Sequence, residues 1–242
     1  MNKTILISGG TSGIGKATAL RMLGEGWNVL VFSNNLKENQ EFIKEVKQTF
    51  HQEQFLVLRG DVTKEASLKK VVKETMKKFK QIDVLFNNAG MGYFVAADKV
   101  NLKKFDLMME VNVIGMAALT KLVVPILKKQ RGGQIINMAS VAGKVGHAKS
   151  EFYAASKSAV LKYSEGLRQE IANFGIKVAT ICPGMVATHF WSKKEYERRK
   201  KESWHGKDPA RLSVEDIARI ISFICNETGY CDIQDITVMP FG

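Results

Sequence analysis

The sequence predicts an α/β fold built as one doubly wound parallel sheet of seven strands with helices on both faces. Short, nearly continuous apolar runs alternate with longer segments in which apolar residues recur every three or four positions. Apolar runs of this kind suit strands that are buried on both faces of a parallel sheet. The chain has only 4 prolines, so its helices can run long.

Seven apolar runs are expected to form the strands. Helical segments separate them, which is the alternation typical of a doubly wound fold. In chain order the expected strands cover residues 4–8, 29–32, 55–58, 84–86, 134–138, 178–182 and 236–238.

Three segments show the helices most clearly. One helix pattern begins at Ser213, because Ser213 and Asp216 resemble a capping box in which Asp replaces Glu. A long helix is expected over residues 102–128, and Pro125 near its end predicts a kink or a stop. The clearest pattern begins at Thr63, with residues at helical spacing at Leu68, Val71, Val72, Thr75, Met76 and Phe79.

Length and composition indicate a globular protein with a single domain over residues 1–242. Hydrophobic residues make up 45% of the chain and charged residues 25%, and no Pro- or Ser-rich linker interrupts it. No stretch approaches the run of about 20 apolar residues that spans a membrane. The N-terminus does not resemble a signal peptide, so a cytoplasmic protein without membrane contact is expected.

Charge and cysteine content bear on further classes of function. The net charge of +12 could attract nucleic acid, but acidic residues interrupt the densest basic run, 193–201, and no nucleic-acid-binding motif accompanies it. Cys182, Cys225 and Cys231 match no zinc spacing. We therefore expect a small-molecule partner, no nucleic acid, free thiols and no metal site.

A glycine-rich loop, residues 8–15, joins the first strand to a helix. Its glycines permit a tight turn and let the backbone approach a pyrophosphate, which the N-terminus of the next helix stabilises. Ligands of doubly wound folds bind beyond the carboxyl ends of the strands. Residues 87–90, Ser140 and Pro183-Gly184 also follow predicted strands, so one cleft is expected there.

Proton-transfer chemistry is suggested by Tyr153 and Lys157. On a helix, residues four apart share one face, and a neighbouring ammonium favours the phenolate. Tyr153 is therefore a candidate general acid and base near neutral pH. With the hydroxyl of Ser140 and the amide of Asn112, the chain holds the groups that reversible proton transfer to a carbonyl needs.

Taken in order, these motifs resemble the short-chain dehydrogenase/reductase family over essentially all 242 residues, although serine replaces the usual threonine before the glycine loop. The resemblance implies a Rossmann-type oxidoreductase that transfers hydride between a nicotinamide cofactor and a carbonyl or secondary alcohol. It implies that Tyr153 delivers the proton while Ser140 bonds the same oxygen. Lys157 would bond the nicotinamide ribose and tune Tyr153, and Asn112 would kink its helix and hold a water connecting Lys157 to solvent.

The resemblance also predicts the cofactor-binding residues. Asp61 would bond the adenine amine, residues 88–90 would line the adenine ribose, and Thr188 would bond the carboxamide. Besides Tyr153 and Lys157, the predicted set is Gly9, Thr11, Ser12, Gly13, Ile14, Gly15, Ser33, Asn34, Asn35, Asp61, Val62, Asn88, Ala89, Gly90, Pro183, Gly184, Val186 and Thr188.

The choice between NADP and NAD depends on the end of the second strand. An NAD enzyme usually carries an acid about 20 residues past the glycine loop, which bonds the ribose 2′-OH. Here Ser33, Asn34 and Asn35 stand there, so both that acid and the arginine of many NADP-preferring relatives are missing. These neutral donors, with Lys37 close enough in sequence to reach a 2′-phosphate, predict NADP as the cofactor, with NAD possible.

Several functions remain open at the level of substrate. The leading prediction is an NADP-dependent oxidoreductase acting on a small ketone, an aldehyde or a 3-oxo or 3-hydroxy acid. The alternative is a 3-oxoacyl-[acyl-carrier-protein] reductase, because Lys128, Lys129 and Arg131 could suit an acidic carrier, although Phe174 stands where that branch often has a basic residue. A catalytically silent cofactor-binding regulator is disfavoured, because both Tyr153 and Lys157 are present.

Two further expectations concern the substrate and the assembly. A substrate lid is expected around residues 186–210, where Phe190, Trp191 and Trp204 would either shape an apolar pocket or pack a surface helix. Members of the resembled family usually form dimers or tetramers through the helices that hold Asn112 and Tyr153, so a homotetramer is predicted.

Overall fold

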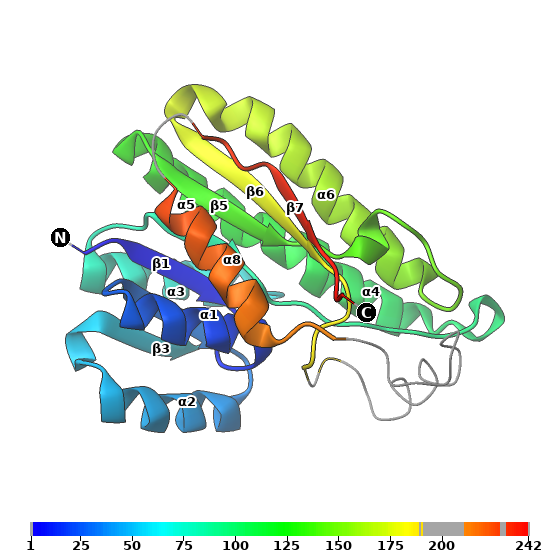
Figure 1. Ribbon diagram of the computed structural model, residues 1–242, viewed down its shortest axis with the longest axis horizontal. Coiled ribbons are helices and arrows are strands. Elements are labelled where there is room, and N and C mark those ends of the chain that lie inside the picture. The colour runs from blue at the N-terminus through cyan, green and yellow to red at the C-terminus, as the bar shows by residue number, and fades with distance from the viewer. Residues whose placement is uncertain (1, 189, 191–210, 228–230, 242) are drawn as a thin grey trace.

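A computed structural model of the chain describes residues 2–188, 190, 211–227 and 231–241. Its seven strands form one parallel sheet in the order β3-β2-β1-β4-β5-β6-β7, which confirms the predicted doubly wound fold (Figure 1). The ends of the strands differ from the predicted ends by at most two residues. The strands are β1 (Thr4–Ser8), β2 (Asn28–Ser33), β3 (Phe55–Arg59), β4 (Val84–Asn87), β5 (Gly133–Met138), β6 (Ile176–Pro183) and β7 (Asp235–Val238).

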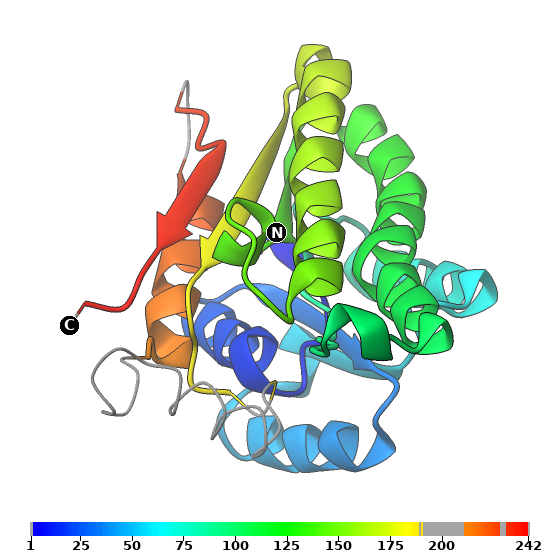
Figure 2. The ribbon, with the colours of Figure 1, turned by 90° about the vertical axis from the view of Figure 1, so that its right-hand side faces the viewer.

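Helices cover both faces of the sheet (Figure 2). On one face lie α1 (Gly13–Gly24), α2 (Leu36–Thr49) and α8 (Val214–Asn226). On the other face lie α3 (Glu65–Phe79), α5 (Gly115–Gln130) and α6 (Glu151–Ile171). A short helix, α4 (Leu102–Met109), precedes α5 and contacts α6.

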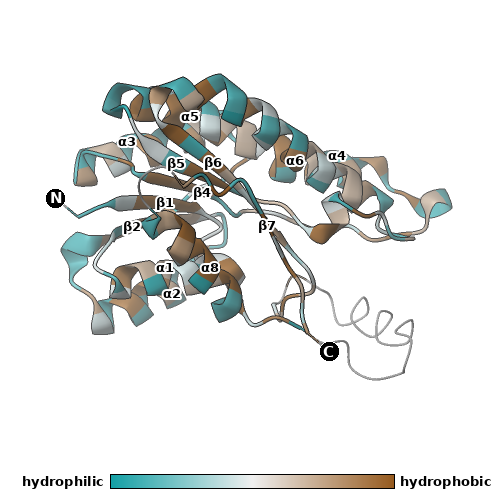
Figure 3. Cartoon of the chain, turned by 45° about the horizontal axis from the view of Figure 1, so that its top comes forward, coloured by the Kyte–Doolittle hydropathy of each residue, from teal (hydrophilic) through white to brown (hydrophobic). Residues whose placement is uncertain are grey.

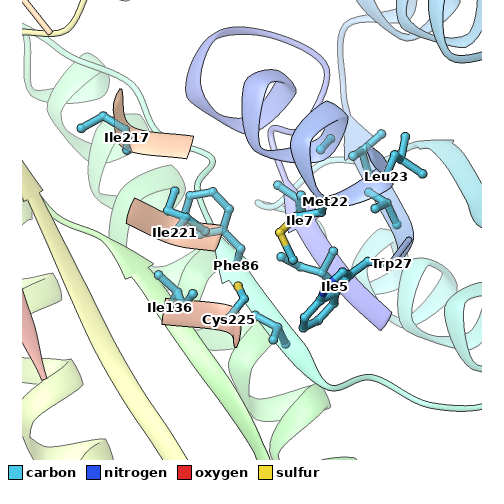
Figure 4. Packing of buried hydrophobic residues seen from close by; sticks show 14 of the residues in the cluster. Ile5, Ile7, Met22, Leu23, Trp27, Phe86, Ile136, Ile217, Ile221 and Cys225 are labelled. Atoms are coloured by element: carbon cyan, nitrogen blue, oxygen red, sulfur yellow. The ribbon is translucent and has the colours of Figure 1, made fainter. Parts of the chain in front are cut away.

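The sheet separates two hydrophobic cores because successive residues of a strand point to opposite faces. Ile5 and Ile7 of β1 join Met22 of α1 and Ile221 of α8 on one side (Figure 4). Leu6 joins the core under α3 and α5 on the other side. Hydrophobic residues accordingly concentrate in the strands and on the inner sides of the helices (Figure 3).

The predicted capping box at the start of α8 is present. The Ser213 hydroxyl accepts the backbone N–H of Asp216 at 3.1 Å, and the Asp216 carboxylate accepts the backbone N–H of Ser213 at 2.8 Å. Two otherwise unpaired donors are thereby satisfied, and the negative charge lies at the favourable end of the helix.

A kink or a stop was predicted at Pro125, and the stop is wrong, because α5 continues to Gln130. Proline removes the N–H that would bond the carbonyl of residue 121. Both Lys121 and Pro125 are exposed, so that carbonyl can be hydrated, while Val123 remains buried against the sheet. The irregularity lies earlier, at a π-helical turn over Glu110–Ile114.

The stretch Leu102–Gln130 is long and apolar enough, by length and composition alone, to cross a membrane, contrary to the expectation that no segment would approach such a span. Leu119, Val123 and Leu127 of this stretch are fully buried in the core beneath the sheet. A core helix passes the same test, and packing of this kind explains the composition without a membrane.

Candidate active site

A cleft of about 590 Å³ opens beyond the carboxyl ends of the strands, where a doubly wound fold binds ligands. Residues from eight well-separated segments meet there. Of the residues predicted from the sequence, the cleft is lined by Gly9, Ser12, Gly13, Ile14, Ser33, Asn34, Asn35, Asp61, Val62, Asn88, Ala89, Gly90, Ser140, Tyr153, Lys157, Pro183, Gly184, Val186 and Thr188.

Three predicted residues, Thr11, Gly15 and Asn112, lie behind the lining and are buried. Gly15 packs against the loop itself, since a Cβ there would stand 2.3 Å from the carbonyl oxygen of Gly9. The side chain of Thr11 turns toward α2, where its hydroxyl lies 3.5 Å from the carboxylate of Glu38. These positions support the lining residues and do not form the cleft wall.

The glycine loop is held to the fourth strand by Ser8 and Asn88. The Ser8 hydroxyl accepts the backbone N–H groups of Asn88 at 3.1 Å and Ala89 at 3.0 Å. The Asn88 amide donates to the carbonyl of Gly9 at 2.9 Å. Gly9 has φ of 63°, a conformation that glycine adopts without strain. The hydroxyl of Ser8 therefore holds the glycine loop to the segment that follows β4.

At the far end of the cleft, Ser33 to Asn35 lead from β2 into α2. The Asn35 side-chain oxygen caps α2 by accepting the backbone N–H groups of Lys37 and Glu38, so its amide nitrogen is left to meet a ligand. The ammonium of Lys37 is 3.9 Å from Glu41 along the helix, and Lys37 is absent from the cleft wall. One carboxylate oxygen of Asp61 accepts both the N–H and the hydroxyl of Thr63.

Tyr153 and Lys157 lie on the buried face of α6. Lys157 is 3% exposed, and its ammonium donates to the carbonyl of Met138 at 2.7 Å and lies 5.8 Å from the centre of the Tyr153 ring. Burial lowers the pKa of Lys157 to about 8. The ammonium is therefore desolvated beside the phenol, which raises the effect of its charge on that ring.

An aromatic cluster of Tyr153, Phe94 and Phe190 closes this end of the cleft. The Tyr153 ring centre lies 5.3 Å from that of Phe94 and 5.7 Å from that of Phe190. Gly92 makes room for the two phenylalanines, because a Cβ on it would approach their rings to 2.5 and 2.8 Å. Aromatic pairs at these distances stabilise one another and keep the tyrosine in one orientation.

Asn112 lies in the π-helical turn and makes three hydrogen bonds. Its oxygen accepts the backbone N–H of Met91, and its amide donates to the carbonyl of Met91 and to the hydroxyl of Ser156. A Cβ on Gly90 would lie 3.3 Å from the Asn112 oxygen and 3.6 Å from the Lys157 ammonium nitrogen. Asn112 thus fixes the segment after β4 close to Lys157.

The loop that carries Ser140 is tied to the last strand. The Ser140 hydroxyl accepts the backbone N–H of Ala142 at 3.1 Å. Four residues on, the ammonium of Lys144 contacts the carboxylate of Asp235 at 2.5 Å. This pairing lowers the pKa of Asp235 against the opposing effect of burial and raises the pKa of Lys144. The other Asp235 oxygen accepts the hydroxyl of Thr180 at 2.9 Å.

Sequence reasoning missed several lining residues, among them Glu38, Met91, Leu107 and Val111. Glu38 lies in the first turn of α2, whereas the acid was looked for at the end of β2, a few residues earlier in the chain. Phe190, expected either to shape a pocket or to pack a helix, lines the cleft. Trp191, Trp204 and the basic run 193–201 lie outside the described residues.

The arrangement fits a dinucleotide. Glycine residues stand where a backbone must approach a ligand closely, and the side chain of Thr188 lies 3.5 Å from the Cβ position of Gly13, so the segment after β6 closes over the loop. The lining runs from Ser33 at one end to Ser140 and Tyr153 at the other. In the part of the chain that the structure describes, no group of three or more His, Cys, Asp or Glu side chains could hold a metal ion.

Comparison with known proteins agrees with this geometry. A family model described as short chain dehydrogenase matches residues 3–199. The chain is 31% identical to a serine 3-dehydrogenase of Agrobacterium fabrum, over 99% of this chain and 94% of that protein. It is 32% identical to an NADP-dependent 3-hydroxy acid dehydrogenase of Schizosaccharomyces pombe, over 98% of this chain and 92% of that protein.

Solved structures with the same fold include ElxO with NADP bound and levodione reductase. ElxO superposes with a TM-score of 0.86 at 27% identity, over 99% of this chain and 98% of ElxO. Levodione reductase superposes with a TM-score of 0.89 at 26% identity, over 98% of this chain and 95% of that one.

Proposed function

The chain belongs to the short-chain dehydrogenase family and is an oxidoreductase, and from this we propose that it is an NADP-dependent reductase of a small carbonyl compound. The observation that carries the proposal is the meeting of Tyr153, Lys157 and Ser140 in one cleft with the glycine loop. The phenol, the desolvated ammonium and the hydroxyl are the groups that polarise and protonate a carbonyl oxygen.

The roles follow from the positions of the side chains. When bound, the nicotinamide supplies the hydride in reduction or accepts it in alcohol oxidation. Tyr153 donates the proton to the carbonyl oxygen, and the hydroxyl of Ser140 donates a hydrogen bond to the same oxygen. Lys157 remains cationic at neutral pH, because its pKa is about 8, and it stabilises the phenolate that proton transfer leaves behind.

Asn112 acts on this site through the backbone. Its three hydrogen bonds hold Met91 and the turn that faces Lys157. We propose that a water near its oxygen connects Lys157 to solvent and returns the proton to Tyr153.

NADP is supported by the relatives named for it and by the neutral donors at Ser33, Asn34 and Asn35. The glycine loop would hold the pyrophosphate at the N-terminus of α1. Asp61, Val62 and residues 88–90 would surround the adenosine, while Pro183, Gly184, Val186 and Thr188 would hold the nicotinamide.

The described wall of the substrate end is mostly apolar, with Met91, Leu107, Val111 and Phe190. Lys157 is the cation among its described lining residues. We therefore propose a small ketone or aldehyde as the preferred substrate, ahead of the 3-oxo and 3-hydroxy acids to which the names of two relatives point. An unpaired carboxylate buried against this wall would lose hydration without gaining a partner.

The positions of the basic residues do not favour the alternative function, a 3-oxoacyl-[acyl-carrier-protein] reductase. Lys128 lies in the last turn of α5, and Arg131 follows the helix shortly before β5 begins, at the edge of the sheet opposite the cleft. Lys128 also lies over the ring of Phe174 at 4.4 Å and 3.7 Å from Glu170, so its charge is partly engaged.

We further propose that residues 1–242 act as one dinucleotide-binding and catalytic domain in the cytoplasm, with a lid around 186–210, assembled as a homotetramer. Leu102, at the start of α4, is 64% exposed, and Ile114, at the end of the π-helical turn before α5, is 60% exposed. Both side chains would gain from burial in an interface. Light scattering at micromolar concentration tests this assembly, and a monomer would contradict it.

The function is tested by titrating NADPH and NADH against the protein and then offering a panel of ketones, aldehydes, 3-oxo acids with their methyl esters, and acetoacetyl thioester. Turnover of neutral ketones or aldehydes with NADPH supports the proposal. Turnover of the free acids in preference to their esters would contradict the proposed substrate class, and turnover confined to the thioester would favour the acyl-carrier alternative.

A further inference from the structure

We propose that Glu38 limits the preference of this chain for NADPH over NADH, an inference that rests on the proposed cofactor site. Glu38 is half-buried in the first turn of α2 and lines the cleft beside Ser33, Asn34 and Asn35. An acid at the end of β2 is the usual partner of the ribose 2′-OH, and Glu38 brings a carboxylate to the same end of the cleft from the following helix.

The orientation of Glu38 follows from two local contacts. The side chain of Asn35 caps α2 and accepts the backbone N–H of Glu38 at 3.3 Å, which fixes the first turn of the helix. The carboxylate of Glu38 then lies 3.5 Å from the hydroxyl of Thr11, a residue of the glycine loop. The carboxylate therefore faces the loop that would hold the cofactor.

No described cation neutralises this carboxylate. Within the described part of the chain, Glu38 forms no ion pair, and Lys37 on the same helix turn is 84% exposed with its ammonium near Glu41. Arg59 is the register partner of Ser33 on β3, but it is exposed and does not line the cleft. The charged residues of the described wall at this end are thus Glu38 and Asp61.

These charges act differently on the two cofactors. A 2′-phosphate brought to Ser33 and Asn34 carries close to two negative charges, and a carboxylate nearby repels it. A 2′-hydroxyl carries no charge and can donate a hydrogen bond to the same carboxylate. The structure therefore predicts that the Glu38 carboxylate lowers the ratio of NADPH affinity to NADH affinity in the wild-type protein, relative to a site that had only the neutral residues Ser33 to Asn35.

The test compares Glu38→Gln with the wild type by calorimetric titration of NADPH and NADH, and of 2′,5′-ADP and 5′-AMP as probes of the 2′-phosphate alone. Glutamine keeps an oxygen for Thr11 and removes the charge. We expect the affinity for NADPH and for 2′,5′-ADP to rise about tenfold. One pair of like charges about 6 Å apart gives roughly threefold at the dielectric constant of water and roughly a hundredfold at that of a protein surface, and tenfold lies between these limits. The affinity for NADH and 5′-AMP should stay the same or fall.

Glu41→Gln is the matched control, because it removes the same charge from the same helix at a 66% exposed side chain that does not line the cleft. It should change each affinity by less than twofold. Equal effects of the two variants, equal effects on phosphorylated and unphosphorylated probes, or no effect of Glu38→Gln would each overturn the inference. A wild type that binds neither NADPH nor NADH would instead overturn the proposed function and this inference with it.

Discussion

Replacing Lys157 by methionine should make the cofactor-free protein more stable at pH 7. The lowered pKa means that the folded protein holds the ammonium at a cost, since 2.5 pKa units between 10.5 and about 8 correspond to about 3.4 kcal/mol. Methionine removes that cost but leaves the carbonyl of Met138 without its donor, which costs about 2 kcal/mol. The expected gain is therefore about 1–2 kcal/mol.

The pH dependence supplies the sharper comparison. Because the pKa of Lys157 is lower in the folded protein, the unfolded chain binds more protons between about pH 8 and 10.5, and wild-type stability rises with pH through that window. The advantage of the Lys157→Met variant should therefore shrink by about 2.5 kcal/mol between pH 7 and pH 10, so that the wild type becomes the more stable at pH 10.

Urea unfolding followed by circular dichroism, at one protein concentration and at both pH values, measures this difference. Lys162→Met is the control on the same helix, because the side chain of Lys162 is 82% exposed and its loss should change stability by less than about 0.5 kcal/mol at either pH. A Lys157→Met variant that is destabilised equally at both pH values would refute the claim that the ammonium is held desolvated.

Three other predictions test the site and its supports. Gly15→Ala should cost about 2–3 kcal/mol of stability and remove cofactor binding, because its Cβ would meet the loop backbone at 2.3 Å. The control Gly166→Ala, in open space within α6, should not destabilise the protein. Thermal melting measures the stability of both variants, and titration measures their cofactor binding. Asp235→Asn should cost about 1 kcal/mol and lower kcat with little change in the KM for cofactor, because it loosens the loop held by Lys144; a KM effect alone would contradict this. NADPH affinity should weaken as pH rises through 8, because Lys157, expected to bond the nicotinamide ribose, loses its charge there. An affinity that does not change from pH 7 to pH 10 would argue against a contact between Lys157 and the cofactor.

The strands inside the sheet could be predicted from the sequence because β1, β4, β5 and β6 are buried on both faces and are therefore apolar along most of their length. The run at Thr4–Ser8, for example, is fully buried and begins and ends where the pattern does. The stop at Pro125 was wrong for the converse reason: proline chemistry is local, but the helix is held by packing of Leu119, Val123 and Leu127 on the sheet.

The candidate site was predictable where a motif carries its own spacing, as with Tyr153 and Lys157 on α6. It was not predictable where residues meet through the fold. The carboxylate of Glu38 reaches the cleft from α2, which is placed by the Asn35 cap at its start and by the packing of Phe42 and Val46 in the core. The contact between Lys144 and Asp235 joins residues 91 positions apart in the chain, and no sequence period marks it.

The measurement that tests the account most directly is turnover and cofactor binding by Tyr153→Phe, with the substrate that the panel identifies. Phenylalanine keeps the ring that packs on Phe94 and Phe190 and removes the hydroxyl. We expect NADPH affinity within about threefold of the wild type and a loss of kcat of at least about a hundredfold, the lower range for a positioned general acid. Retention of most of the wild-type rate would show that another group donates the proton and would contradict the role assigned to Tyr153.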